Sequence, residues 1–297
     1  MKSLLSACRF WAICCLAFAS VAFTGDRPAY RLFTATGQPA DYDQMLQELA
    51  QADVVLFGEQ HNDALTHWLE LQVAKDLARL KPGKLVLGME MFERDVQPLV
   101  AQYAAGTLAD SAFERQARPW PNFATDYRPL VLFARDQKIP VVGTNAPRPF
   151  VSSVARGSLK ALDKLPAGDR ALLAPLPLKV DFDLPGYKKM AAMFGGDSKA
   201  HGGGAQNIIQ AQALRDATMA HFIRSNRQEG QTLLHFNGSY HSDNHDGIVA
   251  YLRQYAPKLR VKTLSVVTQE QLQTLDKEQA NVADFVIIVP ADAAKTY

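Results

Sequence analysis

The sequence predicts an α/β fold: a mostly parallel central sheet flanked by helices, with a smaller helical and loop-rich subdomain. Short apolar runs alternate with longer amphipathic segments along the 297 residues, which is typical of βαβ units. The hydrophobic content of 47% and the charged content of 21% are ordinary for a globular protein. A chain of this length can bury a large core.

The predicted elements follow from hydrophobic periodicity and from the residues that stop it. Short apolar runs predict strands, in chain order, at 31–36, 54–57, 85–89, 139–143, 232–236, 261–267 and 284–289. Helical periodicity predicts helices at 41–50, 63–80, 96–105, 108–117, 129–137, 150–156 and 207–224. Between 165 and 204, prolines and two glycine clusters break this rhythm and predict a loop-rich insertion. We therefore expect one α/β domain at 23–297, with a largely helical subdomain around 95–204.

The first 22 residues have the pattern of a signal peptide. Lys2 and Arg9 precede an apolar run at 10–23, and small residues near 17–22 offer cleavage sites. The run is shorter than the roughly 20 residues that a membrane-spanning helix needs, although an uncleaved anchor is the alternative. Cys8, Cys14 and Cys15 all lie in this segment, so the mature chain would hold no cysteine. We expect an exported protein, periplasmic or associated with the cell envelope; a lipid on Cys8 is weakly supported, because no apolar region precedes it.

Polar residues that could form a site follow three predicted strands. A Gly-x-x-His motif occurs twice, as Gly58-Glu59-Gln60-His61 and as Gly238-Ser239-Tyr240-His241. Glu90 ends a third apolar run. Parallel sheets bind ligands at the carboxyl ends of their strands, so Glu59, His61, Glu90 and His241 are expected to share one cleft. Two imidazoles and two carboxylates there suit acid–base catalysis or a divalent metal ion, with these four residues as ligands.

Simpler roles remain open for some of these residues. Glu59 and His61 could cap the helix that follows, although Asn62 and Asp63 suit that role better. His67 falls on the predicted helix 63–80, where a position in the cleft, the core or the surface is possible.

The insertion carries a different signal. Tyr187, Met190, Met193 and Phe194 are spaced to share one face of a helix. A phenol beside such an apolar stripe suits a ferric porphyrin, because tyrosine is a haem ligand and methionine packs adaptably on flat groups. The alternative is that the stripe covers the protein's own core.

Several ordered stretches resemble ChaN-type haem-binding uptake proteins, which share a superfamily with Tiki-type proteases and erythromycin esterases. The resemblance rests on the two Gly-x-x-His motifs, on Gly88-Met89-Glu90 between them, and on the stretches at 139–148 and 211–220. It covers roughly 30–255. Because this superfamily contains both binding proteins and hydrolases, the resemblance is stronger for family than for activity.

The resemblance implies haem bound through a tyrosine, a histidine near the propionates, and two chains paired around facing haems. On this basis we expect Tyr187 to ligate the iron, Met190 and Met193 to contact the macrocycle, and His201 to lie near the propionates. Other tyrosines remain rivals for the iron: Tyr103, Tyr127, Tyr240 and Tyr251.

Two functions therefore remain. The first is an exported haem-binding protein in haem or iron uptake, working as a homodimer and with possible envelope haem-uptake partners. The second is a metal-assisted hydrolase, esterase-like or protease-like, that uses Glu59, His61, Glu90 and His241. The insertion is expected to be separate from this cleft. A net charge of +2, with no basic run interleaved with aromatic residues, argues against nucleic acid as a partner.

Overall fold

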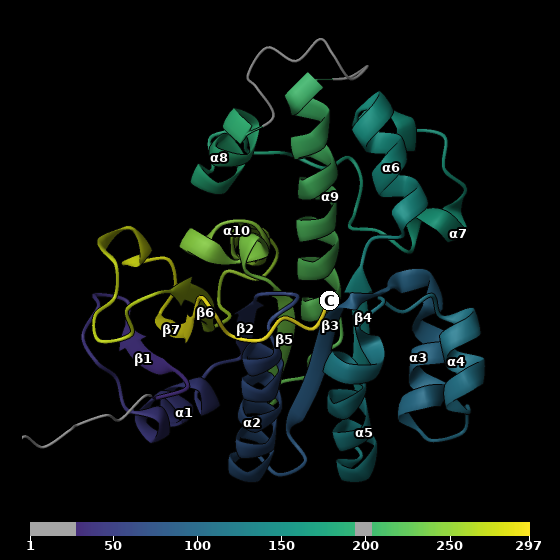
Figure 1. Ribbon diagram of the computed structural model, residues 1–297. Coiled ribbons are helices and arrows are strands. Elements are labelled where there is room, and N and C mark those ends of the chain that lie inside the picture. The colour runs from purple at the N-terminus through teal and green to yellow at the C-terminus, as the bar shows by residue number, and fades with distance from the viewer. Residues whose placement is uncertain (1–27, 194–203) are drawn as a thin grey trace, which may run out of the picture.

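The computed structural model describes residues 28–193 and 204–297 and confirms the predicted α/β class (Figure 1). One seven-stranded sheet has the order β1-β7-β6-β2-β5-β3-β4, and every neighbouring pair is parallel except β1 and β7. The predicted signal peptide at 1–22 and His201 lie outside the described residues. Within 28–193 and 204–297, no helix has the length and apolar character needed to cross a membrane.

The seven strands coincide with the apolar runs of the sequence. They are β1 (Arg31–Thr34), β2 (Val54–Glu59), β3 (Leu85–Glu93), β4 (Val141–Asn145), β5 (Thr232–Gly238), β6 (Val261–Gln269) and β7 (Phe285–Pro290). The central strands β2 and β5 are buried along their whole length, because helices cover both faces of the sheet.

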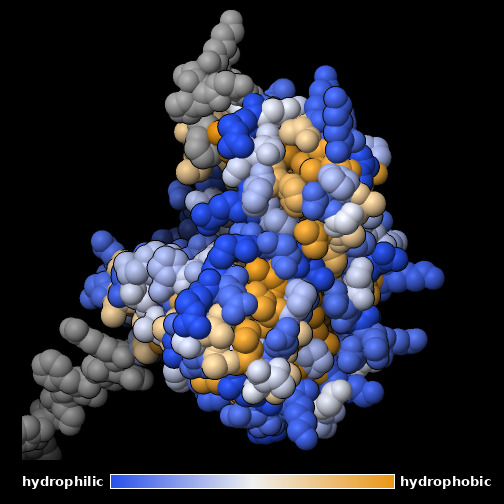
Figure 2. All heavy atoms as spheres, turned by 90° about the vertical axis from the view of Figure 1, so that its right-hand side faces the viewer, coloured by the Kyte–Doolittle hydropathy of each residue, from blue (hydrophilic) through white to orange (hydrophobic). Residues whose placement is uncertain are grey.

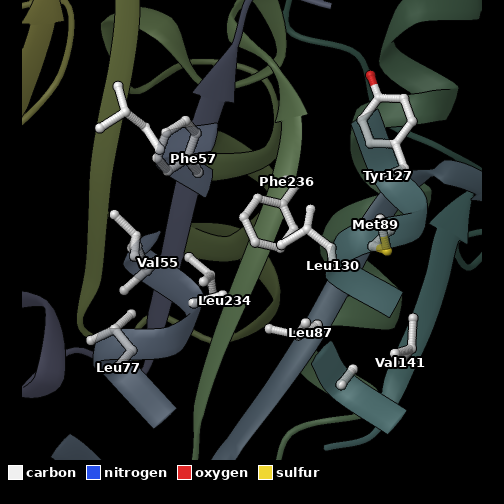
Figure 3. Close-up of a cluster of buried hydrophobic side chains, with 14 of the residues drawn as sticks. Val55, Phe57, Leu77, Leu87, Met89, Tyr127, Leu130, Val141, Leu234 and Phe236 are labelled. Carbon is white, nitrogen blue, oxygen red and sulfur yellow. The ribbon is translucent and has the colours of Figure 1, made fainter. Parts of the chain in front are cut away.

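Five helices cover one face of the sheet. They are α1 (Tyr42–Ala50), α2 (Ala64–Leu80), α3 (Gln97–Ala104), α4 (Asp110–Gln116) and α5 (Arg128–Gln137). Figure 3 shows part of this core, with Leu130 of α5 beside Phe236 of β5 and Leu77 of α2 beside Val55 of β2. Asp63 caps α2, as predicted, by accepting a hydrogen bond from the Thr66 backbone N–H at 2.8 Å.

Another group of helices covers the opposite face. They are α6 (Arg148–Gly157), the short α7 (Ala167–Arg170), α8 (Pro185–Met193), α9 (Gly204–Ser225) and α10 (Ile248–Tyr255). Successive residues of a strand point to opposite faces, so Val54 and Leu56 pack here against α9 and α10. The long α9 rises beyond the sheet between α8 and α6 (Figure 1).

The segment around 95–204, predicted to be a largely helical subdomain, contains α3 to α8 and also supplies the edge strand β4 to the common sheet. Its treatment as a separate subdomain stays a prediction. Figure 2 views the side of the molecule that carries α3, α4 and α6, where hydrophobic patches lie among charged side chains.

The strand order positions the polar residues found in the sequence. β5 lies between β2 and β3, and Glu59 is paired in register with Gly238. The two Gly-x-x-His motifs therefore leave the sheet side by side and at the same level, with the end of β3 on the other side of β5.

Candidate functional site

The side chains of Glu59, His61, Glu90 and His241 meet at the carboxyl ends of β2, β3 and β5. The Gly238 backbone N–H donates to Glu90 Oε2 at 2.8 Å, and Glu90 Oε1 lies 3.1 Å from His241 Nε2. The His61 ring packs on Gly238 so closely that a β-carbon there would lie 2.6 Å from His61 Nε2. The expected convergence is therefore present in the structure, while the catalytic and metal-binding roles of these four residues stay predictions.

His241 is held between two carboxylates. Its Nε2 faces Glu90 of β3, and its Nδ1 donates to Asp216 Oδ1 of α9. The second oxygen of Asp216 accepts from the Tyr187 hydroxyl at 2.7 Å. The insertion and the cleft were expected to be separate, and this was wrong: Tyr187, Asp216 and His241 form one chain of contacts.

The charge of this buried group follows from its geometry. Burial alone would lower the pKa of His241, but the Glu90 and Asp216 carboxylates raise it to about 10. Burial alone would raise the pKa of Glu90, but the His241 cation lowers it to about 2. Both ring nitrogens of His241 therefore face a carboxylate, and this environment favours the imidazolium form at neutral pH.

His61 has a different environment. Its Nδ1 lies 2.5 Å from Glu59 Oε1, and the same oxygen accepts from the Tyr127 hydroxyl at 2.7 Å. Figure 3 shows the Tyr127 oxygen pointing away from the apolar core. The His61 side chain is 37% exposed, whereas Glu59 is buried. His61 can therefore meet a ligand, while Glu59 and Tyr127 orient it.

Two effects oppose each other in the pKa of His61. Burial lowers it, whereas the hydrogen bond to Glu59 and the Glu90 charge raise it, and the net result lies above 6.5. For Glu59, burial and the nearby Glu70 carboxyl raise the pKa well above 4.5. The two pKa shifts are coupled, because Glu59 and His61 share one proton. We place this proton in the short hydrogen bond between them and not on either residue alone.

A second polar layer lies beneath His61. His67 of α2 is buried, with its Nδ1 2.9 Å from Glu70 Oε2 and its Nε2 3.1 Å from the His61 carbonyl oxygen. Asn122 donates to the same carbonyl at 2.9 Å and to Asp126 Oδ2 at 2.6 Å. This layer fixes the backbone from which the His61 side chain projects.

The residues predicted to contact haem differ in their exposure. Tyr187 is 3% exposed and packs in the core between α8 and α9, so an iron ion could reach its oxygen only after α8 moved. Burial and the Asp216 charge also raise its pKa well above 10, which disfavours the phenolate. Met190 is half-buried and Met193 is exposed. The stripe on α8 thus covers the protein's own core at Tyr187, as the alternative interpretation predicted.

The rival tyrosines differ sharply in exposure. Tyr103, Tyr127 and Tyr251 are buried. Tyr240, which precedes His241 in the short turn after β5, is 60% exposed. It is therefore the one candidate among these five tyrosines whose ring is accessible.

A pocket of about 800 Å³ lies near the site, although His61 is not one of its lining residues. Trp120 forms part of its wall and also contacts His61, with ring centroids 4.8 Å apart. Apolar and charged side chains complete the lining: Met91, Glu93, Asp95, Ala117, Arg118, Pro119, Pro121, Arg148, Pro149 and Ser152.

Several residues of the site were missed from the sequence. Asp216 lies in the apolar stretch of α9, where a fully buried acid signals a buried partner. Glu70 follows His67 by three residues, which places both on one face of α2. No comparable signal marks Tyr127, because its role depends on how α5 packs against the sheet.

Comparisons with known proteins identify a family and similar folds. The chain matches the family described as "Haem-binding uptake, Tiki superfamily, ChaN" over residues 45–252. No curated protein matches it. A solved structure described as "Cofacial heme binding to ChaN of Campylobacter jejuni" has a TM-score of 0.64 at 16% identity, covering 88% of this chain and 97% of that chain.

Weaker structural similarity extends further. A Bacillus cereus protein has a TM-score of 0.48 at 13% identity, covering 84% of this chain and 92% of that one. A variant of the erythromycin esterase EreC in its open conformation has a TM-score of 0.46 at 12% identity, covering 90% of this chain and 84% of that one. The family match spans most of the sequence, and the chain belongs to the ChaN family of haem-binding uptake proteins in the Tiki superfamily.

Proposed function

We propose that this chain is an exported haem-binding protein that acts in haem or iron uptake. Family membership supports haem as the ligand. The observation that carries the proposal to this chain is the exposed phenol of Tyr240 at the ligand-binding edge of the sheet. Tyrosine is an established axial ligand of haem iron, and Tyr240 offers its oxygen without any rearrangement of the core.

Exposure of the ligand also favours a paired arrangement. A haem bound through a surface tyrosine would leave one face of its macrocycle in water. Large apolar surfaces of this kind are usually covered by a partner. A second copy of this chain, carrying its own haem, would cover that face, so we propose a homodimer with facing haems.

Haem titration of the mature protein tests this function. Haemin should produce a ferric spectrum with tyrosinate charge-transfer bands, and binding should move the protein to the dimer in size-exclusion chromatography. Tyr240→Phe should remove these bands and lower the affinity. Tyr187→Phe is the matched control: it removes the same oxygen from a buried position and should keep the bands.

Two outcomes would contradict the assignment of Tyr240 as the haem ligand. A wild-type protein that leaves the haemin spectrum unchanged would remove haem binding altogether. Bands lost in Tyr187→Phe but kept in Tyr240→Phe would place the ligand on α8 instead.

His201→Ala should weaken haem binding less than loss of the tyrosine ligand, by about 1.5–3 kcal/mol, if that residue donates to a propionate.

Export is tested independently of haem. The charge and apolar pattern of residues 1–22 predicts a mature chain that begins near Ser20 or Phe23. Mass spectrometry of the protein from its native envelope checks this start. An intact Met1, or a lipid mass on a cysteine, would exclude the soluble exported form.

A second candidate function is hydrolysis, and the partly exposed ring of His61 favours it. A half-exposed imidazole oriented by a buried carboxyl is a suitable acid–base group. In such a reaction His61 Nε2 would take a proton from water as its oxygen attacks a carbonyl, and would return that proton to the leaving group. Glu59 is too buried to touch substrate, so we give it a positioning role.

A screen of ester and peptide substrates, with and without manganese, zinc or cobalt, tests this candidate. His61→Gln should abolish any activity found. Glu59→Gln should lower kcat with little change in KM, whereas Trp120→Ala should mainly raise KM. Activity that survives His61→Gln would exclude this mechanism.

A further inference from the structure

A compact group of ligand atoms lies behind the candidate site. One atom each of Glu59, His67 and Glu70 lies within 4.8 Å of the others. Glu59 comes from the end of β2, and the other two come from the first turns of α2. All three residues are buried, at 2%, 5% and 0% exposure.

Two carboxylate oxygens of this group have no hydrogen-bond partner within the described part of the chain. They are Glu59 Oε2 and Glu70 Oε1. The other oxygen of Glu59 is already used by His61 and Tyr127. Buried carboxylate oxygens without a partner are costly and are normally satisfied by a donor or a cation.

The ring of His67 faces the same two carboxyl groups. A carbonyl oxygen can only accept, so His67 Nε2, 3.1 Å from the His61 carbonyl, carries a hydrogen. His67 Nδ1 lies 2.9 Å from Glu70 Oε2 and 3.8 Å from Glu59 Oε2, so one ring nitrogen and two carboxyl oxygens face one another.

We propose that Glu59, His67 and Glu70 bind one divalent transition-metal ion. One imidazole nitrogen and two carboxylate oxygens suit zinc, manganese or ferrous iron. An ion about 2.0–2.2 Å from each atom fits among them with small side-chain movements. The His67 Nε2–H held by a backbone carbonyl, with Asp126 Oδ2 3.4 Å away, is the outer contact usual for a metal-bound histidine.

This ion would be linked to the candidate site through Glu59. Oε2 of Glu59 faces the proposed ion, while its Oε1 holds His61 Nδ1 at 2.5 Å. Metal binding would therefore stiffen the residue that orients His61. The proposed ligands differ from the four-residue metal set expected from the sequence: Glu59 belongs to both sets, whereas His67 and Glu70 come from α2.

Metal titration of the chelator-treated mature protein tests the site. Zinc, manganese and cobalt are added separately, bound metal is measured by mass spectrometry after dialysis, and the cobalt absorption spectrum reports nitrogen and oxygen ligands. One equivalent should bind and raise Tm. Glu70→Gln and His67→Gln should weaken binding by more than the roughly 10–100-fold expected for Asp126→Asn, which removes only an outer contact.

Glu90→Gln is the matched control, because it makes the same acid-to-amide change in the neighbouring group and should keep the bound equivalent. No bound equivalent in the wild-type protein would overturn the proposal. So would a bound ion that survives both Glu70→Gln and His67→Gln, or one lost in Glu90→Gln but kept in Glu70→Gln. Circular dichroism of each metal-free variant separates loss of the site from loss of the fold.

Discussion

The two Gly-x-x-His motifs follow neighbouring paired strands, yet their histidines have different environments. His61 has one carboxylate contact and a side chain that is 37% exposed. His241 is 6% exposed and lies between Glu90 and Asp216. The motif therefore determines the position of the imidazole, whereas the helices packed around the ring determine its charge and its exposure.

The two histidines therefore have different roles at the edge of the sheet. His241 joins three elements, because its partners come from β3 and α9 while it follows β5 itself. Such a buried cation is suited to holding the strand ends together. The His61 side chain is 37% exposed and packs against Trp120, so of the two histidines it is the one that a ligand or substrate can reach.

The largest predicted effect on stability comes from an acid-to-amide change at Asp216, compared with the same change at Glu59. Asp216→Asn removes a buried negative charge from the His241 cation and should lower the free energy of unfolding by about 3–5 kcal/mol. Glu59→Gln should cost less than about 1 kcal/mol, because the proton shared with His61 already offsets the buried charge and an amide oxygen can still accept. Urea unfolding measures both, and equal losses would contradict the proposed difference between the motifs.

Two glycine substitutions should have smaller effects. A β-carbon on Gly247, which has a φ of +48°, would lie 2.4 Å from the His241 carbonyl oxygen, and this backbone contact cannot easily relax. Gly247→Ala should therefore cost about 1–3 kcal/mol. Gly238→Ala would instead push the end of the half-exposed His61 ring, so it should cost less and break the contact with Glu59.

Thermal unfolding and the NMR signal of the His61 ring report these two effects separately. An unchanged His61 resonance in Gly238→Ala would show that the ring does not rest on Gly238.

The sequence predicted the fold and one half of the site for a clear physical reason. Strand ends in a parallel sheet share one edge, so Glu59, His61, Glu90 and His241 could be placed together from the pattern alone. Asp216 and Tyr127 reach the same place from helices, and helix packing does not follow from periodicity. The burial of Tyr187 could not be predicted for a related reason, since an apolar stripe looks the same in the sequence whether it faces a ligand or the core.

Moderate changes of pH should affect stability less than these substitutions. The pKa of His241 rises from 6.5 to about 10 on folding, so its contribution is complete below pH 6.5 and is lost as pH rises through about 10. The pKa of Glu90 falls from 4.5 to about 2, so its contribution is complete above pH 4.5 and is lost as pH falls through about 2. Stability from this pair should therefore be greatest between pH 4.5 and 6.5.

Calorimetry across pH checks this window, with Glu90→Gln as the comparison. Removing the Glu90 charge should move the alkaline loss of stability to lower pH, because His241 then keeps only one carboxylate. An NMR titration in which His241 loses its proton near pH 6.5 would contradict the fixed cation.

The smallest effect on stability is expected at Tyr240, beside His241 in the same motif. Its ring is 60% exposed, so Tyr240→Phe should change the free energy of unfolding by no more than about 0.5 kcal/mol. Tyr187→Phe removes a buried hydrogen bond to Asp216 and should cost about 1.5–3 kcal/mol. If Tyr240 binds haem iron, the substitution that barely affects folding will abolish the tyrosinate spectrum, and the one that weakens the fold will leave it intact. Unfolding and haem spectra measured on the same two variants check both predictions. If the tyrosinate bands were lost in Tyr187→Phe and kept in Tyr240→Phe, haem binding would depend on the buried contacts from Tyr187 to His241.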